Sequence, residues 1–260
     1  MRISFDCHVH TLRSACGEDI TDEWLFQQAR TRDLCFAVTD HTMHLYYEPE
    51  IAWAMYREDA IELFEARKAV GRERVVRYME DLRAGGCPNL LVGVELDVLP
   101  DGQFMFPDDL RGQLDICLGA VHVLPSAEAR GQQPAVEAEQ RQQTLWLMEY
   151  GVDVLAHPFR TMLSSGYTVS DDLVTWTVEQ AAEHGVALEV NSHKRYRDHD
   201  LLMVRRCDEL GVRLACGSDA HNTREFGVFD YQRQVFCEAG LSDGRLAELL
   251  FTPEMCGTYR

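Results

Sequence analysis

Two histidines near the start of the chain, His8 and His10, are the first residues whose types and spacing could do chemistry. The segment before them alternates apolar and polar residues over positions 3–7, which is typical of a β-strand. Side chains two positions apart project from the same face of a strand, so the two imidazoles point together. A shared metal ion would use this arrangement. Alone, however, a His-x-His motif more often consists of two incidental histidines.

The motif does not stand alone, because most later apolar segments also end in a residue that can bind metal. Six of the ten histidines fall at such positions, whereas random placement would scatter them. Apolar segments at 35–38, 90–94, 116–121, 152–156, 186–190 and 212–216 are followed by His41, Glu95, His122, His157, Asn191, and then Asp219 and His221. Any one of these residues could instead cap a helix or hold a loop. Together they predict a metal centre.

The elements between these segments read as helices. Thr21 can cap one helix, and Pro134, Ser170 and Ser242 suit the starts of others. Residues 50–84 have a helical pattern that Gly71 is expected to divide, and 42–49 reads as a loop. Glycines at 151, 185 and 211 each precede a Val-led strand, as expected after a helix end.

Strands that alternate with helices form a parallel sheet. Seven such strands predict an α/β fold with a closed or nearly closed barrel and a site at the carboxyl ends of the strands. We expect one domain over residues 1–260, with a helical insertion at about 50–85.

Composition limits the possible partners. The chain has 260 residues and a formal net charge of −18, which repels nucleic acid and anionic membranes. It does not exclude an anionic substrate, because bound metal ions set the local field. Arg2 and Asp6 interrupt any signal-peptide pattern, and we find no apolar run of membrane-spanning length. The nine cysteines form no Cys-x-x-Cys motif, and we expect them to be free thiols in a reducing compartment. The expected location is therefore the cytoplasm.

Six short motifs together resemble those of the PHP (polymerase and histidinol phosphatase) superfamily. They occur in the family's order between Ile3 and about Gly227: His8-Val9-His10, Thr39-Asp40-His41, Gly93-Val94-Glu95, Gly119-Ala120-Val121-His122, Ala156-His157-Pro158 and Gly217-Ser218-Asp219-Ala220-His221. The segments at 93–97 and 118–122 are most similar to the histidinol-phosphate phosphatase branch.

The resemblance implies a distorted seven-stranded (β/α) TIM-like barrel with two to three divalent ions of zinc, manganese or iron. It implies that His8, His10, Glu95 and Asp219 hold the first ion. Glu95 would also bridge to a second ion held by His122 and His157, and His41 and His221 would hold a third. The implied reaction is hydrolysis of a small-molecule phosphate monoester by a metal-bridging hydroxide, with Glu95, Asp219, His221 and Arg160 as catalytic residues and histidinol phosphate as a candidate substrate.

One position departs from the family pattern. Related phosphatases usually carry a further histidine about six residues beyond the second histidine, and here that position is Cys16. A thiolate binds divalent ions well, zinc in particular, so we expect Cys16 to be a metal ligand. Three alternatives stay open: Glu18 or Asp19 substitutes, the third site is empty, or Cys16 is a buried small hydrophobe.

Several polar residues near the same barrel end are candidates for substrate binding. Arg160 in His-Pro-Phe-Arg offers a guanidinium that matches phosphate geometry. Asn191, Lys194 and Arg195 lie in a loop at that end, and we expect one of the two cations to reach phosphate. Asp40 could orient an imidazole. Tyr46 and Tyr47 border the substrate pocket or only pack a loop. The remaining histidines are expected at the surface: His44, His184, His193 and His199.

Three other functions are compatible with parts of this pattern. An amidohydrolase also begins with His-x-His, but it usually needs a bridging lysine where this chain has His122. A PHP nuclease or phosphodiesterase would act on nucleic acid, which the acidic surface disfavours. A barrel that keeps metals only for structure would have lost ligands, and only position 16 is altered. The expected partner is a small phosphorylated molecule, with no nucleic acid and no membrane; the sequence assigns no oligomeric state.

Overall fold

The computed structural model describes residues 2–48, 52 and 60–253, and seven parallel strands form its sheet. Neighbouring strands in the sheet follow chain order, which confirms the predicted alternation. The strands are β1 (Phe5–Val9), β2 (Cys35–Val38), β3 (Leu90–Asp97), β4 (Ile116–Ala120), β5 (Val154–Leu155), β6 (Ala187–Asn191) and β7 (Leu214–Gly217). Their residues are buried, as in parallel sheets covered on both faces.

The two outer strands, β1 and β7, meet and nearly close the barrel. Val9 pairs in parallel with Ala220, just beyond β7. His10 N donates to Ala220 O at 2.9 Å, and Asp219 N donates to His8 O at 2.9 Å. The closure therefore places the first and the last predicted metal ligands side by side.

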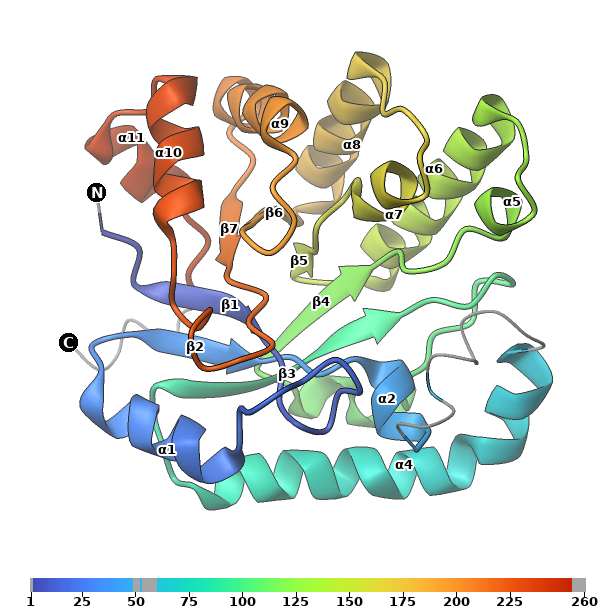
Figure 1. Cartoon of the computed structure of the whole chain (residues 1–260), viewed down its shortest axis with the longest axis vertical. Coiled ribbons are helices and arrows are strands. Elements are labelled where there is room, and N and C mark those ends of the chain that lie inside the picture. Colours follow the sequence, from blue (N-terminus) through green and yellow to red (C-terminus); the bar gives the residue numbers. More distant parts are fainter. Residues whose placement is uncertain (1, 49–51, 53–59, 254–260) are drawn as a thin grey trace.

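Helices cover both sides of the strands (Figure 1). Helices α6, α8, α9 and α10 lie along one side of the sheet, and α1 and α4 lie along the other. The helices are α1 (Asp22–Thr31), α2 (Thr42–Tyr46), α4 (Ala60–Ala84), the 3-10 helix η1 (Asp108–Gln113), α5 (Pro125–Glu128), α6 (Gln133–Tyr150), α7 (Arg160–Ser164), α8 (Asp171–His184), α9 (Arg197–Leu210), α10 (Asp230–Ala239) and α11 (Asp243–Leu249).

The predicted helix ends are confirmed. Thr21 Oγ1 accepts from Trp24 N at 3.3 Å, and Ser170 and Ser242 cap α8 and α11 in the same way. The glycines after α6, α8 and α9 adopt the left-handed conformation that ends a helix with little strain.

Two predictions about the segment after β2 are wrong. Residues 42–46 form α2 and not a loop, because the Asp97 carboxylate accepts from Met43 N at 2.7 Å and anchors the helix start. Gly71 does not divide α4, which is continuous over 25 residues. A Cβ at Gly71 would lie 2.1 Å from Cδ1 of Tyr46, so glycine lets α2 pack closely against α4. Apart from Ala52, residues 50–59 of the predicted insertion lie outside the described residues.

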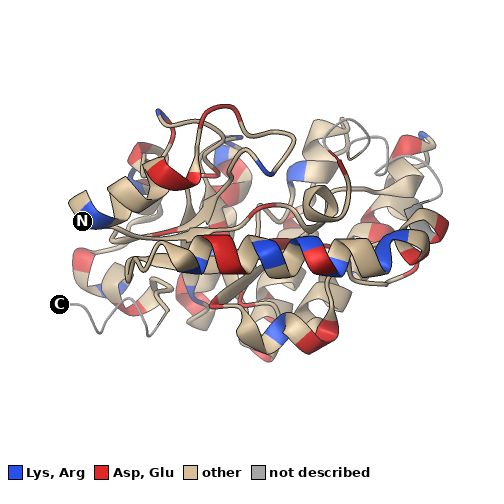
Figure 2. Ribbon diagram, turned by 90° about the horizontal axis from the view of Figure 1, so that it is seen from below, with Lys and Arg blue, Asp and Glu red and all other residues tan. Residues whose placement is uncertain are grey.

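Charged residues of both signs lie on the surface helices. Figure 2 shows acidic and basic residues interspersed along α4. Among the described helices, none has the length and apolar character that crossing a bilayer requires. Seven described cysteines carry free thiols. The expectation of a cytoplasmic location, which assumed a reducing compartment, stays a prediction.

Candidate metal centre

The carboxyl ends of the strands bring the eight predicted histidine and carboxylate ligands into one cluster. We call this set the metal cluster: His8, His10, His41, Glu95, His122, His157, Asp219 and His221. His8, His10, Glu95 and Asp219 are at most 1% exposed. His8 lies in β1 and His10 directly after it, Glu95 lies in β3, and Asp219 lies in the segment after β7. Parallel strands meet at one end of the barrel, which explains why residues so far apart in sequence converge.

Glu95 lies at the centre of the metal cluster, and its two oxygens face different imidazoles. Oε1 lies 2.7 Å from Nε2 of His157 and 3.1 Å from Nε2 of His122. Oε2 lies 2.8 Å from Nδ1 of His41, 3.3 Å from Nε2 of His8 and 3.5 Å from Nε2 of His10. One carboxylate can therefore serve two ion positions at once.

Asp219 faces the opposite side of the His8–His10 pair. Its Oδ1 lies 3.1 Å from Nε2 of His10, 3.7 Å from Nε2 of His8 and 3.8 Å from Nε2 of His221. Asp219 has φ 51° and His157 has φ 29°, both positive. Non-glycine residues adopt this region at a cost, and such strain concentrates where a side chain must be aimed at a site.

Cys16 joins the metal cluster from the loop after β1. Its Sγ and ring nitrogens of His10 and His41 lie within 4.8 Å of one another. The loop is held by His44, because Ala15 N donates to Nδ1 of His44 at 3.0 Å. The prediction of a surface position for His44 is wrong, since the residue is 1% exposed. Burial and the neighbouring His41 lower the pKa of His44 to about 3, which keeps its ring a neutral acceptor.

The electrostatics keep several cluster histidines neutral, the form that ligates metal. Burial and the neighbouring His41 lower the pKa of His10 well below its usual value. Burial and Arg160 lower the pKa of His157 to about 4, and burial also lowers the pKa of His221. For Glu95, burial opposes ionisation, but His41, His122 and His8 outweigh it and hold its pKa well below the usual range. Neighbouring carboxylates act in the opposite direction on two other rings: Glu189 and Glu95 raise the pKa of His8 well above its usual value, and Glu95 and Asp97 raise the pKa of His122 to about 10, in both cases against the effect of burial.

The sequence reasoning missed Glu189, a buried carboxylate in β6. Its Oε1 lies 2.9 Å from Nδ1 of His8, and its Oε2 accepts from His157 N at 2.7 Å and from Asn191 Nδ2 at 3.0 Å. With Nδ1 of His8 held in this way, Nε2 faces the cluster. The available signal was a carboxylate inside an otherwise apolar strand, two residues from Asn191 and therefore on the same face.

Asp97 plays the same part for His122 and was also given no role. Its Oδ1 lies 2.7 Å from Nδ1 of His122, while Oδ2 accepts from Thr42 Oγ1 at 2.9 Å. Asp97 stands two residues after Glu95 in β3, a spacing that could have identified it. Through these two contacts, Asp97 links the orientation of His122 to the first residue of α2.

The expectation that Asp40 orients an imidazole is met indirectly, through Ser14. Asp40 Oδ1 accepts from Thr11 N at 2.8 Å and from Ser14 Oγ at 2.6 Å. Ser14 Oγ in turn lies 3.3 Å from Nδ1 of His10. Three carboxylates thus orient three different histidines of the metal cluster. Glu189 contacts His8, Asp97 contacts His122, and Asp40 acts on His10 through Ser14.

The predicted substrate-binding residues divide into two groups. Arg160 and Asn191 both donate to Asp219 Oδ2, and Lys194 lines a small cavity beside them. Arg195 is exposed and donates to Ser192 O at 3.3 Å. His193 is exposed, as predicted, and its ring centroid lies 4.6 Å from that of His221. Tyr46 and Tyr47 are buried, and Tyr46 lines a separate pocket beyond α2.

Residues 6–193, well over half of the chain, match the model of the PHP domain. The chain belongs to the PHP family. The resemblance seen in the motifs is thereby confirmed, and the metal cluster of this PHP protein comes from those same motifs.

Curated relatives of this PHP protein include two kinds of protein. The DNA polymerase/3'-5' exonuclease PolX of Bacillus subtilis is 28% identical over 188 residues, which are 72% of this chain but only 29% of that protein. A protein named probable phosphatase from Shewanella sp. (strain ANA-3) is 27% identical over 240 residues, 88% of this chain and 81% of its own length.

A solved structure shows the same PHP fold. The histidinol phosphate phosphatase of Lactococcus lactis, solved in complex with zinc, L-histidinol and phosphate, aligns with a TM-score of 0.53 and 12% sequence identity. The alignment covers 92% of this chain and 94% of that one. The nearly closed barrel of seven parallel strands is therefore that of a known PHP structure.

The donor set fits divalent metal ions. Several groups of three His, Cys, Asp or Glu ligand atoms lie within 4.8 Å of one another, and most of these residues are buried. Mixed imidazole and carboxylate donors suit zinc, manganese and iron. Nε2 of His8 and Nε2 of His10 lie only 3.2 Å apart, an approach that a shared cation between them would stabilise.

Proposed function

We propose that this PHP protein hydrolyses small-molecule phosphate monoesters at the metal cluster. The observation that carries the proposal is the position of Glu95, whose two oxygens face two separate sets of imidazoles. Adjacent ions bridged by one carboxylate are typical of enzymes that attack phosphorus in line. The phosphatase name of relatives that match most of the chain supports the same reaction.

We assign three ion positions. His8, His10, Glu95 and Asp219 would hold the first ion, and Glu95, His122 and His157 the second. His41, His221 and Cys16 would hold the third. When bound, zinc, manganese or iron supplies Lewis acidity and lowers the pKa of water for attack.

The residues of the chain have three tasks beside the ions. Glu189 and Asp97 hold Nδ1 of His8 and His122, which leaves Nε2 of each ring for ligation. Arg160, whose side chain is 17% exposed, can offer its remaining N–H groups to phosphoryl oxygens and neutralise their charge. Asn191 and Lys194 flank that position and would fix the orientation of the phosphate.

We further propose histidinol phosphate as the first substrate to test, and a single PHP domain over the whole chain. The substrate choice is supported by the L-histidinol and phosphate in the solved structural neighbour. The net charge of −18 favours a small substrate over nucleic acid.

The experiment is phosphate release by protein loaded with zinc, manganese or iron. Histidinol phosphate and p-nitrophenyl phosphate represent monoesters, and bis-p-nitrophenyl phosphate represents diesters. We expect the wild-type protein to hydrolyse the monoesters. The Glu95→Gln variant, which loses the shared charge but keeps the side-chain size, should have a rate that is several orders of magnitude lower. Equal turnover by the Glu95→Gln variant would contradict the proposal, as would no phosphate release with any metal.

A PHP nuclease or phosphodiesterase is the second candidate, because the relative with the highest identity among those compared above is an exonuclease. That match covers only 29% of the relative, which limits its weight. Faster cleavage of the diester or of single-stranded DNA than of any monoester would favour this alternative.

A further inference from the structure

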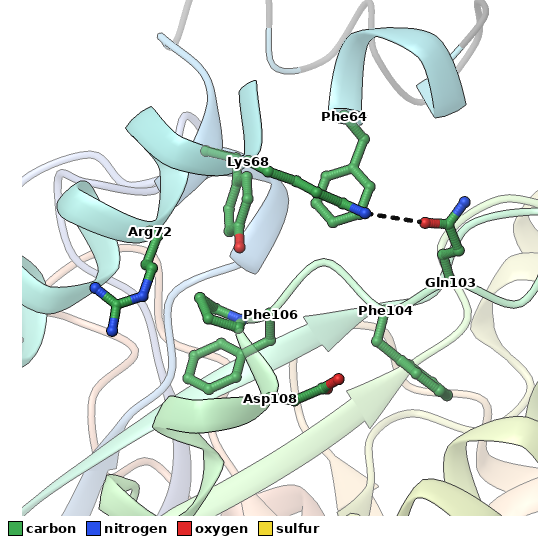
Figure 3. A pocket seen from close by; sticks show the side chains of 9 residues that line it. Phe64, Lys68, Arg72, Gln103, Phe104, Phe106 and Asp108 are labelled. Carbon is green, nitrogen blue, oxygen red and sulfur yellow. Dashed lines mark hydrogen bonds between the residues drawn. The ribbon is translucent and has the colours of Figure 1, made fainter. Parts of the chain in front are cut away.

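A second pocket lies beyond α2, outside the metal cluster. It encloses about 400 Å³ between the first half of α4 and the segment that follows β3 (Figure 3). We call it the aromatic pocket, and its lining residues are Tyr46, Phe64, Lys68, Arg72, Gln103, Phe104, Phe106, Pro107 and Asp108. None of them belongs to the metal cluster or to the residues that support it.

The aromatic pocket opens at the same end of the barrel as the metal cluster. Helix α2 separates the two sites, with His41 immediately before the helix and Tyr46 at its last residue. Phe106 likewise follows β3, the strand that carries Glu95. The pocket is thus a neighbour of the metal cluster with walls of its own.

Four aromatic side chains form the apolar walls. The ring centroids of Tyr46 and Phe64 lie 5.4 Å apart with their planes tilted by 46°. Figure 3 shows the rings of Phe64, Phe104 and Phe106 around the cavity. Aromatic faces and edges arranged in this way accept a planar ring by stacking and edge contacts.

Two cations, Lys68 and Arg72, lie one turn apart on α4 and line the same cavity. Figure 3 shows the Lys68 ammonium directed toward Gln103, whose Oε1 is 3.4 Å away. Arg72 donates to Asp109 at 2.6 Å, and Lys68 also pairs with Glu65. Both acidic partners are more than half exposed, and such surface pairs are weak enough to be exchanged for a bound anion.

A third donor is the Tyr46 hydroxyl. Tyr46 is 2% exposed and lines the pocket. Burial raises the pKa of Tyr46, so the group stays protonated and can donate. The Asp108 carboxylate is the one acidic group in the lining, and it accepts from the Tyr150 hydroxyl at 3.3 Å. Donors exceed acceptors, which favours a negatively charged ligand.

We infer that the aromatic pocket binds a planar aromatic ring that carries an anionic group. The rings provide the apolar contact, and Lys68, Arg72 and Tyr46 provide charge and hydrogen bonds. This site is independent of the proposed hydrolytic reaction, because it needs neither metal nor phosphate chemistry.

The test is calorimetric titration of the metal-loaded protein with 1-naphthoate, in the presence of inorganic phosphate to occupy the metal cluster. Wild type is expected to bind 1-naphthoate, and the neutral analogue 1-naphthalenemethanol at least about tenfold more weakly, because it lacks charge-assisted hydrogen bonds. The double variant Lys68→Gln/Arg72→Gln should weaken naphthoate binding by a similar factor. Arg67→Gln/Arg74→Gln is the matched control on the same helix, since both arginines pair with Glu48 outside the pocket.

Phosphatase activity of each variant is measured in parallel, so a failure of the pocket and a failure of the proposed function are separate results. Tyr46→Phe, which keeps the ring and removes the hydroxyl, gives a second and milder test with an expected severalfold loss. Absent binding to wild type would overturn the inference. Equal affinity for the neutral analogue, or equal binding by both double variants, would also overturn it.

Discussion

Glu189 Oε1 lies 2.9 Å from Nδ1 of His8, and both side chains are fully buried. Burial opposes the charge on His8, but the carboxylates of Glu189, Glu95 and Asp219 outweigh it and raise the pKa of the ring well above its usual value. A carboxylate behind a ligating histidine fixes the ring and increases its basicity. Glu189 is therefore part of the site although it is directed at the far side of the ring.

Glu189→Gln should weaken metal binding without unfolding the barrel. Loss of such a supporting carboxylate typically costs about 10- to 100-fold in metal affinity. Competition against a chelator of known affinity measures this change. Glu179→Gln, at an exposed position on α8, is the matched control. Unchanged affinity in the Glu189 variant would show that the contact with His8 only packs the strand.

Arg160→Ala should impair substrate binding and spare metal content. Arg160 contacts Oδ2 of Asp219, whereas Oδ1 faces His10 at 3.1 Å, so the ligand side of the carboxylate is untouched. We expect KM for a phosphate monoester to rise by about 10- to 100-fold, equivalent to roughly 1.5–3 kcal/mol. Arg195→Ala serves as a control because that side chain is exposed and bonded to Ser192. Normal KM together with lost metal would assign Arg160 to the ions instead.

Cys16 can be tested by metal content alone. Burial raises the pKa of its thiol well above the usual value, so a nearby cation is needed to keep it as thiolate. If Cys16 is a ligand, Cys16→Ala should lose one ion per chain by elemental analysis and Cys16→His should retain it. Cys237→Ala, at an exposed free cysteine, should match wild type. Equal metal content in wild type and Cys16→Ala would argue against ligation.

Asp200 should make stability depend on pH. Burial raises its pKa to about 7 from 3.8, although the Tyr231 hydroxyl bonded to it lowers the value. Between these two pKa values the folded state holds a proton that the unfolded state has lost. The free energy of unfolding therefore falls as pH rises from about 4 to 7, by up to about 4 kcal/mol at 1.36 kcal/mol per unit.

Asp200→Asn removes that titration and keeps an acceptor for Tyr231. Urea unfolding of wild type and variant should show the variant more stable at pH 8, with the difference shrinking toward pH 5. Asp198→Asn on the same helix should show no such trend, because its side chain is 89% exposed. A wild-type to variant difference that does not change with pH would mean that Asp200 is ionised throughout.

The barrel and its ligand end could be predicted from the sequence because the strands follow a local pattern. Apolar runs end near residues that can bind metal, and at three junctions glycine precedes the next strand, so the topology can be inferred without long-range information. The same rule predicted positions such as His157 and Asp219. Their positive φ values were not predictable from that rule, because it says nothing about backbone conformation after the strand.

The residues that escaped prediction act across the fold. Glu189 reaches His8 over 181 positions, and Asp97 joins His122 to α2. His44 resembled a surface residue because its burial depends on how the loop at Ala15 folds over α2. Gly71 resembled a helix breaker, whereas its small size serves the contact with Tyr46. Such roles depend on packing partners that no local pattern specifies.

The pairing of Val9 with Ala220 has a consequence for biosynthesis. The ribosome adds Asp219 and His221 more than two hundred residues after His8 and His10. Until then a nascent chain can offer an ion only part of its donors, and long-range contacts of this kind form late in folding. Full-affinity metal uptake should thus mark the moment at which the barrel has closed, and apo chains should accumulate wherever translation stalls before Asp219.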